Sequence, residues 1–168
     1  MQQRIDNAYA RGLTTEEVKN EEDFKAFTKL LHQHHWFKPK RYIPDNQFFK
    51  EAAKTDSCRL FVTKYQQHVI GCSVCVYSQG DAYLWYAAFR RKTYVMLHPD
   101  TLTIWHTIKY AHQNGYNHIN FMDVGLPFRK NSFREFILSF GGKPVSTVRW
   151  FRCSIRWINA LLSWIYRD

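Results

Sequence analysis

The sequence predicts an α/β (α+β) domain with a mixed central sheet: an antiparallel meander, a βαβ crossover and flanking helices. Three strand-like runs follow one another with only short polar turns between them: 58–65, 68–77 and 81–89. A helical run then begins at Pro99 and stops at Gly115, and a fourth strand-like run covers 118–125. Tight turns join antiparallel strands, whereas a crossover helix joins parallel ones.

The N-terminal part predicts a weak strand followed by two helices. A short helical segment turns at Gly12 into residues 13–19, whose threonines and glutamates have only modest β-propensity. Residues 21–35 have the clearest helical pattern, because apolar residues form one stripe and acidic residues fill the first turn. A second, shorter helix is expected over 45–56, with Asp45 as its N-cap.

The central runs predict three strands and the crossover helix. Gln66 and Gln67 separate the first two runs and indicate a hairpin, and the Gln79-Gly80 pair indicates the next turn. In the crossover helix the expected apolar face consists of Leu102, Trp105, Ile108 and Ala111.

Three further elements are expected after Gly125. A helix over 132–140 would be capped by Ser132 and ended by Gly141 and Gly142, and a last strand would cover 144–153. The tail, 154–168, has the pattern of an amphipathic helix that is too short to span a bilayer. Its apolar stripe is expected to pack on the domain or on a partner subunit; the alternative is an anionic membrane surface.

Length and charge bound the organisation and the ligands. A chain of 168 residues predicts a single domain, 1–168. The net charge of +10 favours phosphate-bearing ligands, but it does not choose among nucleic acid, nucleotide cofactors and lipid headgroups. No P-loop, Ser-His-Asp order or nucleophile elbow is visible in the sequence.

Cysteine usage indicates a reduced, cytoplasmic setting. The chain has four cysteines, and its first thirty residues are too polar for a signal peptide. Cys72 and Cys75 lie within one predicted strand, where positions three apart point to opposite faces, so we expect core residues and no metal. Peripheral association with the inner face of the membrane is the alternative to a purely cytoplasmic location.

Four segments together carry a family resemblance: RIDNAYARGLTTEEV, YLWYAAF, LTIWHTIKYAHQNGYNHINFMDVG and SFREFILSFGGKPV. They resemble the second half of the FemABX-type aminoacyltransferases and the BioF2-like acetyltransferase domains, which share the GCN5-related N-acetyltransferase (GNAT) fold. Two features depart from the pattern. Ile137 follows Phe136 where the family commonly has a lysine, and the chain begins where the second of two halves would begin.

The resemblance implies an N-acyltransferase that passes an acetyl or aminoacyl group to an amine, for example on a cell-wall precursor. It implies acetyl-CoA or another acyl-CoA as donor, with aminoacyl-tRNA as the alternative. Expected partners are tRNA, an anionic lipid-linked substrate, and a second copy or a second GNAT-like half. The rival hypothesis is a catalytically inactive half-domain that binds a partner protein, an anionic membrane surface or RNA.

The connector 90–98 departs from the GNAT enzymes that use acetyl-CoA. Those enzymes usually hold the donor's phosphates in a glycine-rich turn before the crossover helix, and this connector contains no glycine. Arg90 and Arg91 are candidates to contact phosphates as point charges instead; the alternative is a solvated basic loop.

Candidate site residues gather around the two parallel strands, because ligands of open parallel sheets bind at the strands' carboxyl ends. Asp123 is the candidate to orient or deprotonate an amine, with a structural turn cap as the alternative. Tyr86 is the second catalytic candidate, although at most one face of its strand is expected to be functional. The candidate binding residues are Trp85, Arg90, Arg91, His98, His106, Arg129 and Lys130. For both histidines the alternative is a partly exposed surface position.

Overall fold

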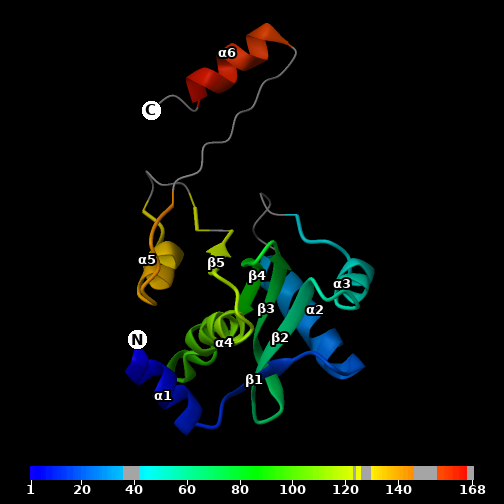
Figure 1. Ribbon diagram of the computed structural model, residues 1–168, viewed down its shortest axis with the longest axis vertical. Coiled ribbons are helices and arrows are strands. Elements are labelled where there is room, and N and C mark those ends of the chain that lie inside the picture. Colours follow the sequence, from blue (N-terminus) through cyan, green and yellow to red (C-terminus); the bar gives the residue numbers. More distant parts are fainter. Residues whose placement is uncertain (36–41, 123, 126–129, 146–154, 166–168) are drawn as a thin grey trace. The chain divides into compact units, whose positions relative to one another are not determined.

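The computed structural model describes most of the chain (Figure 1). The described residues are 1–35, 42–122, 124–125, 130–145 and 155–165. The chain divides into two units, 1–125 and 126–168.

A five-stranded mixed sheet forms the centre of the first unit (Figure 1). Its strands are β1 (Thr14–Glu17), β2 (Cys58–Tyr65), β3 (His68–Ser78), β4 (Asp81–Phe89) and β5 (His118–Phe121), and they lie side by side in chain order. The first four strands pair antiparallel, whereas β5 pairs parallel to β4. The predicted meander and the parallel crossover are therefore confirmed, although β5 ends earlier than the expected 118–125.

Both predicted hairpin turns form, with two residues at positive φ in each. Gln66 and Gln67 have φ of 48° and 67°, and Gln79 and Gly80 have φ of 52° and 82°. Positive φ at both central positions is the geometry of the type I′ turn, whose twist matches the twist of antiparallel strands. The turns thus set the register of β2, β3 and β4.

Four α-helices belong to this unit: α1 (Gln2–Ala10), α2 (Glu21–His35), α3 (Asn46–Ala52) and α4 (Pro99–Gln113). Asp45 caps α3 as predicted, since its carboxylate accepts a hydrogen bond of 2.8 Å from the Phe48 N–H. Helix α2 packs on β3 and β4, and α4 contacts β2, β3 and β4 from the other face with α1 against it (Figure 1).

The face of the sheet beneath α2 carries a continuous apolar core. Phe27 and Leu31 of α2 and Phe49 of α3 are fully buried against Val62 and Val74 of the sheet. Burial of each such side chain contributes roughly 1.5–3 kcal/mol to stability. This core is why the apolar stripe of 21–35 could be read directly from the sequence.

The interface between α4 and the sheet is only partly apolar, which corrects the expected apolar face. Leu102 and Ala111 are buried as predicted, but Trp105 and Ile108 are only half-buried. The buried positions include three threonines instead: Thr101, Thr103 and Thr107. The helix is covered by the sheet and by α1, so its buried surface is wider than one stripe.

Hydrogen bonds make this buried polar interface possible. Thr103 Oγ1 lies 2.6 Å from Thr63 Oγ1 of β2 and donates to the Pro99 carbonyl at 2.7 Å. Thr107 Oγ1 donates to the Thr103 carbonyl at 2.9 Å and lies 3.1 Å from Ser73 Oγ of β3. Buried hydroxyl groups are costly only when they lack such partners.

The second unit contains α5 (Ser132–Leu138) and α6 (Arg156–Ile165). Asn131, not the expected Ser132, caps α5, because its side-chain oxygen accepts the N–H groups of Phe133 and Arg134 at 2.9 and 3.1 Å. Residues 146–153 of the expected last strand lie outside the described residues.

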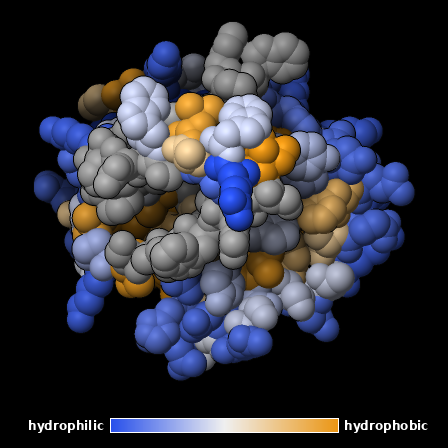
Figure 2. All heavy atoms as spheres, turned by 90° about the horizontal axis from the view of Figure 1, so that it is seen from above, coloured by the Kyte–Doolittle hydropathy of each residue, from blue (hydrophilic) through white to orange (hydrophobic). Residues whose placement is uncertain are grey.

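Large apolar side chains of α6 and its approach are exposed in the described part of the second unit. They are Ile155, Trp157, Leu161 and Trp164. In the view of Figure 2, apolar side chains reach the surface beside hydrophilic ones. Among the described helices none has the length and apolar character needed to cross a bilayer.

Candidate functional site

A bulge in β4 brings two aromatic side chains to one face of the sheet. Val74 of β3 pairs with Tyr86 and the next residue, Cys75, pairs with Leu84, so Trp85 is an extra residue in β4. Strict alternation would send Trp85 and Tyr86 to opposite faces. An extra residue breaks that alternation, and both rings pack against the core beneath α2 and α3.

Helix α3 provides the aromatic contacts of this pair. The Trp85 ring stacks on Phe48 with a centroid distance of 6.2 Å and an interplanar angle of 23°. The Tyr86 ring meets Phe49 edge to face at 5.9 Å, and the Tyr86 hydroxyl donates to the Tyr42 carbonyl at 3.0 Å. Phe48 is 41% exposed and Tyr42 is 80% exposed, so this aromatic group borders solvent.

The pairing of β4 with β5 ends at the same point. The last paired residues are Leu84 and Phe121, and one further hydrogen bond of 3.4 Å joins the Met122 N–H to the Leu84 carbonyl. The described β4–β5 ladder thus covers only residues 81–84 of β4. Ligands of open parallel sheets bind at the carboxyl ends of the strands, which is where this ladder ends.

The connector after β4 leads to the N-terminus of α4 through a short 3₁₀ turn, η1 (Val95–Leu97). His98 follows in the left-handed conformation, with φ of 48°, and its carbonyl accepts the N–H groups of Thr101 and Leu102 at 3.0 and 3.3 Å. The role of His98 in this geometry is that of a backbone cap. Arg90 and Lys92 are exposed.

A carboxylate occupies the first turn of α4. Asp100 is only 6% exposed, its Oδ1 accepts the Thr101 N–H at 2.8 Å, and its Oδ2 lies 3.4 Å from Arg91 Nε. Pro99 has no N–H to offer. The Thr101 N–H and the Nε of Arg91 therefore already have acceptors within the chain.

These observations test the expected acyl-CoA donor. A pyrophosphate at a helix N-terminus needs free backbone N–H groups, close approach to the chain and no competing negative charge. The turn before α4 has no glycine, Pro99 has no N–H, the Thr101 N–H already has acceptors, and Asp100 adds a negative charge. The residues present at this position do not fit the pyrophosphate of CoA.

The remaining predicted site residues are dispersed. His106 lies on α4 with its ring 5.0 Å from that of Phe61 on β2, two strands away from the bulge. Lys130 is exposed in the second unit. Asp123 and Arg129 lie outside the described residues, so their assignments stay predictions from the sequence.

His106 provides a prediction about pH. Burial, reinforced by Lys109, lowers the pKa of His106 below its usual value. Below about pH 6.5 the unfolded chain therefore binds a proton that the native chain does not. The free energy of unfolding consequently decreases as the pH is lowered. We expect His106→Gln to reduce the loss of the urea midpoint between pH 7.5 and 5.5.

The control for this experiment is His68→Gln, because His68 is exposed at the start of β3. His68→Gln should keep the pH dependence of the wild type. Equal pH dependence in wild type and His106→Gln would contradict the prediction.

The buried cysteines do not provide a nucleophile. Burial raises the pKa of Cys58 to about 11 and that of Cys72 to about 12, and it also raises the pKa of Cys75. The thiolate is the reactive form of cysteine, so these groups are unreactive near neutral pH. All three are free and buried, as expected for core residues.

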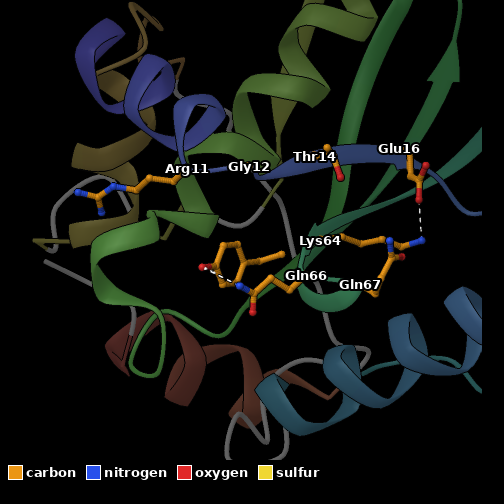
Figure 3. Close-up of a pocket in the computed structure, with 8 residues that line it drawn as sticks. Arg11, Gly12, Thr14, Glu16, Lys64, Gln66 and Gln67 are labelled. Atoms are coloured by element: carbon orange, nitrogen blue, oxygen red, sulfur yellow. Dashed lines mark hydrogen bonds and ion pairs between the residues drawn. The ribbon is translucent and has the colours of Figure 1, made fainter.

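A pocket of about 540 Å³ lies elsewhere, between the start of β1 and the β2–β3 turn (Figure 3). Its cations are already engaged. Lys64 Nζ pairs with Glu16 at 2.6 Å and with Asp23 at 2.8 Å, and Arg11 donates to the Met96 carbonyl. The Arg11 and Lys64 side chains point away from each other in Figure 3. No predicted site residue lines this pocket.

Two features of the site were missed by sequence reasoning. The bulge at Trp85 has no local signal, because 81–89 has the pattern of a regular strand. The carboxylate of Asp100 did have a local sequence signal, because an acidic residue directly after a proline at a helix start often lies in the first turn. Its ion pair with Arg91 depends on the fold of the connector.

Solved structures share this architecture at low sequence identity. One is an aminoglycoside acetyltransferase, meta-AAC0020, from an uncultured soil metagenomic sample, in complex with sisomicin (TM-score 0.60, 15% identity, 90% of this chain and 99% of that chain). Another is AAC(6′)-Iy in complex with a bisubstrate analogue, CoA-S-monomethyl-acetylneamine (0.63, 13%, 85% and 99%). A third is a transcriptional regulator from Bacillus halodurans C-125 (0.62, 17%, 84% and 99%).

No curated protein matches the chain significantly. The family model described as an acetyltransferase (GNAT) domain matches residues 2–130, which contain the whole sheet, α4 and the β4 bulge. The chain therefore belongs to the GNAT acetyltransferase domain family.

Proposed function

We propose that the chain is an N-acyltransferase that acts at the carboxyl ends of β4 and β5. The observation that carries this proposal is the coincidence, at Trp85, of the β4 bulge with the end of β4–β5 pairing. It lies beside two aromatic rings in a domain of the GNAT family. Ligands of open parallel sheets bind at the carboxyl ends of the strands, where the ladder ends.

The proposed chemistry assigns one proton transfer to each catalytic candidate. The amine nitrogen forms a bond to the acyl carbon, and the bond between that carbon and the leaving group breaks. Asp123 takes the proton released by the nitrogen, and the Tyr86 hydroxyl gives a proton to the leaving group. Trp85 and Phe48 offer aromatic surface to the acceptor beside this point.

We propose an amine on an anionic acceptor, such as a lipid-linked cell-wall precursor. The net charge of +10 and the exposed Arg90 and Lys92 attract an anion and repel a polycation such as an aminoglycoside. Acyl-CoA is the donor class that the family favours, and aminoacyl-tRNA is the second donor to test. Both the resemblance to FemABX-type and BioF2-like proteins and the basic surface support this choice.

The test combines donor binding with product formation. Acetyl-CoA and a charged tRNA are titrated while tryptophan fluorescence is followed, with Trp85→Phe to identify the reporting ring. Acyl transfer to a cell-wall precursor peptide and to an aminoglycoside is measured by mass spectrometry. We expect transfer to the precursor to be about tenfold faster or more, and Asp123→Asn to reduce it at least about 100-fold.

The competing candidate is a catalytically inactive domain that binds a partner protein, an anionic membrane surface or RNA. Asp100 at the N-terminus of α4 favours it, because it opposes phosphate binding where the fold would hold a donor. If neither donor changes the fluorescence and no acylated product forms, the enzyme hypothesis is wrong and this candidate replaces it.

A further inference from the structure

We propose that Asp100 is a built-in anion at the N-terminus of α4, and that the chain recognises its acyl donor without a phosphate at that position. The inference rests on the proposed function, because it names what the donor site lacks. It assigns the donor to a class whose phosphates are not bound at the N-terminus of α4.

The first argument is the hydrogen bonding of the helix start. The first N–H groups of a helix have no partner within the helix and attract anions for that reason. Here the Thr101 N–H, in the first turn of the helix, donates to both Asp100 Oδ1 and the His98 carbonyl. Proline at the first helical position removes one more donor.

The second argument is charge. The Asp100 side chain is 8% exposed and its partner Arg91 is 73% exposed, so the carboxylate is the buried member of the pair. A carboxylate in the first turn interacts favourably with the helix dipole, which is the interaction that a bound phosphate would use. A phosphate brought to the same turn would meet a negative charge with little water between them.

The third argument is the conformation of the connector. The residue of the connector in the left-handed conformation is His98, with φ of 48°. Its side chain occupies space beside the backbone that a glycine at this position would leave open. The side chains of Val95 and Met96 in η1 are exposed and apolar, at 58% and 67%. The turn before α4 thus presents apolar side chains and a guanidinium whose Nε is paired with Asp100. It does not present a glycine-rich backbone that a phosphate could approach closely.

The experiment uses inorganic pyrophosphate and ADP as probes of the α4 N-terminus. Amide chemical shifts of Thr101 and Leu102 are followed during titration of the full chain, together with calorimetry. Asp100→Asn is the test variant, because it keeps an oxygen that can accept the Thr101 N–H while removing the charge. Asp81→Asn is the matched control, because it removes the same charge from the opposite end of β4, where Asp81 pairs with His118.

We expect no saturable shift at Thr101 and Leu102 in the wild type or in Asp81→Asn. Asp100→Asn should bind either probe at least about tenfold more tightly, with shifts at those two amides. Arg91→Gln, which keeps the charge of Asp100, should bind neither pyrophosphate nor ADP at the N-terminus of α4. Unchanged β2 and β3 amide shifts show that each variant is folded.

Two results would overturn the proposal: saturable pyrophosphate shifts at Thr101 and Leu102 in the wild type, or equal affinities of Asp100→Asn and Asp81→Asn. Failure of the proposed function gives a different pattern, in which no donor produces acylated product while the Asp100→Asn effect is still present. The two failures are therefore distinguishable.

Discussion

Replacing Tyr86 with Phe is expected to lower the rate constant for acyl transfer at least about 100-fold, since general acid catalysis contributes roughly 10²–10⁴-fold. The Tyr86 hydroxyl lies where the bulge turns the ring toward α3, and it donates to the Tyr42 carbonyl at 3.0 Å. Phenylalanine keeps the ring contact with Phe49 and removes only the proton donor. The measurement is the single-turnover rate with a saturating donor and amine.

The matched control is Tyr83→Phe. Tyr83 is in the same strand, but it lies where β4 is paired on both sides, with Val76 and Asn120. Its rate should stay within about twofold of the wild type, as for a substitution without a catalytic role. With a donor whose leaving group is less basic, the loss caused by Tyr86→Phe should shrink, because less protonation is needed. A loss independent of the leaving group would assign Tyr86 a structural role.

Gly71→Ala is expected to lower the free energy of unfolding by about 3 kcal/mol, the upper range for overpacking a close interface. A Cβ at Gly71 would lie less than 3.0 Å from Thr103 Oγ1, 3.2 Å from Thr63 Cβ and 3.4 Å from the Pro99 carbonyl oxygen. These atoms belong to the hydrogen-bonded interface between α4 and the sheet, so they cannot move apart without losing hydrogen bonds. Urea unfolding followed by circular dichroism measures the change.

Two further variants separate this clash from a general effect of alanine. Gly142→Ala adds a Cβ whose nearest atom is the Ile137 carbonyl oxygen at 3.8 Å, so its change should be within about 0.5 kcal/mol. The double variant Gly71→Ala/Thr103→Ala should be more stable than the sum of the single changes predicts, because Thr103→Ala removes the nearest clashing atom. Strict additivity would show that the clash with Thr103 does not cause the loss.

Much of the fold was predictable because the decisive signals are local. The α2 stripe, the ranges of β2 and β4, the Asp45 cap and both hairpin turns agree with the sequence analysis. Each depends on the side-chain period of a helix or strand, or on turn chemistry within a few residues. The parallel pairing of β5 followed from the length of the crossover.

The errors have equally specific causes. The buried threonines of α4 look polar in a hydrophobic pattern, yet Thr103 and Thr107 find partners on the chain and on neighbouring strands. Ser132 and Asn131 are both good N-caps, and the choice between them depends on where the helix begins. The alternation rule failed at Trp85 because a bulge depends on the pairing with β3.

Local chemistry alone was enough to specify the mixed sheet and its helices, because periodicity and turn preference act over short distances. The shared face of Trp85 and Tyr86, and the carboxylate of Asp100 against Arg91, arose only when distant segments packed together. A bulge depends on the neighbouring strand and the ion pair on the folded connector, and those neighbours exist only in the tertiary structure.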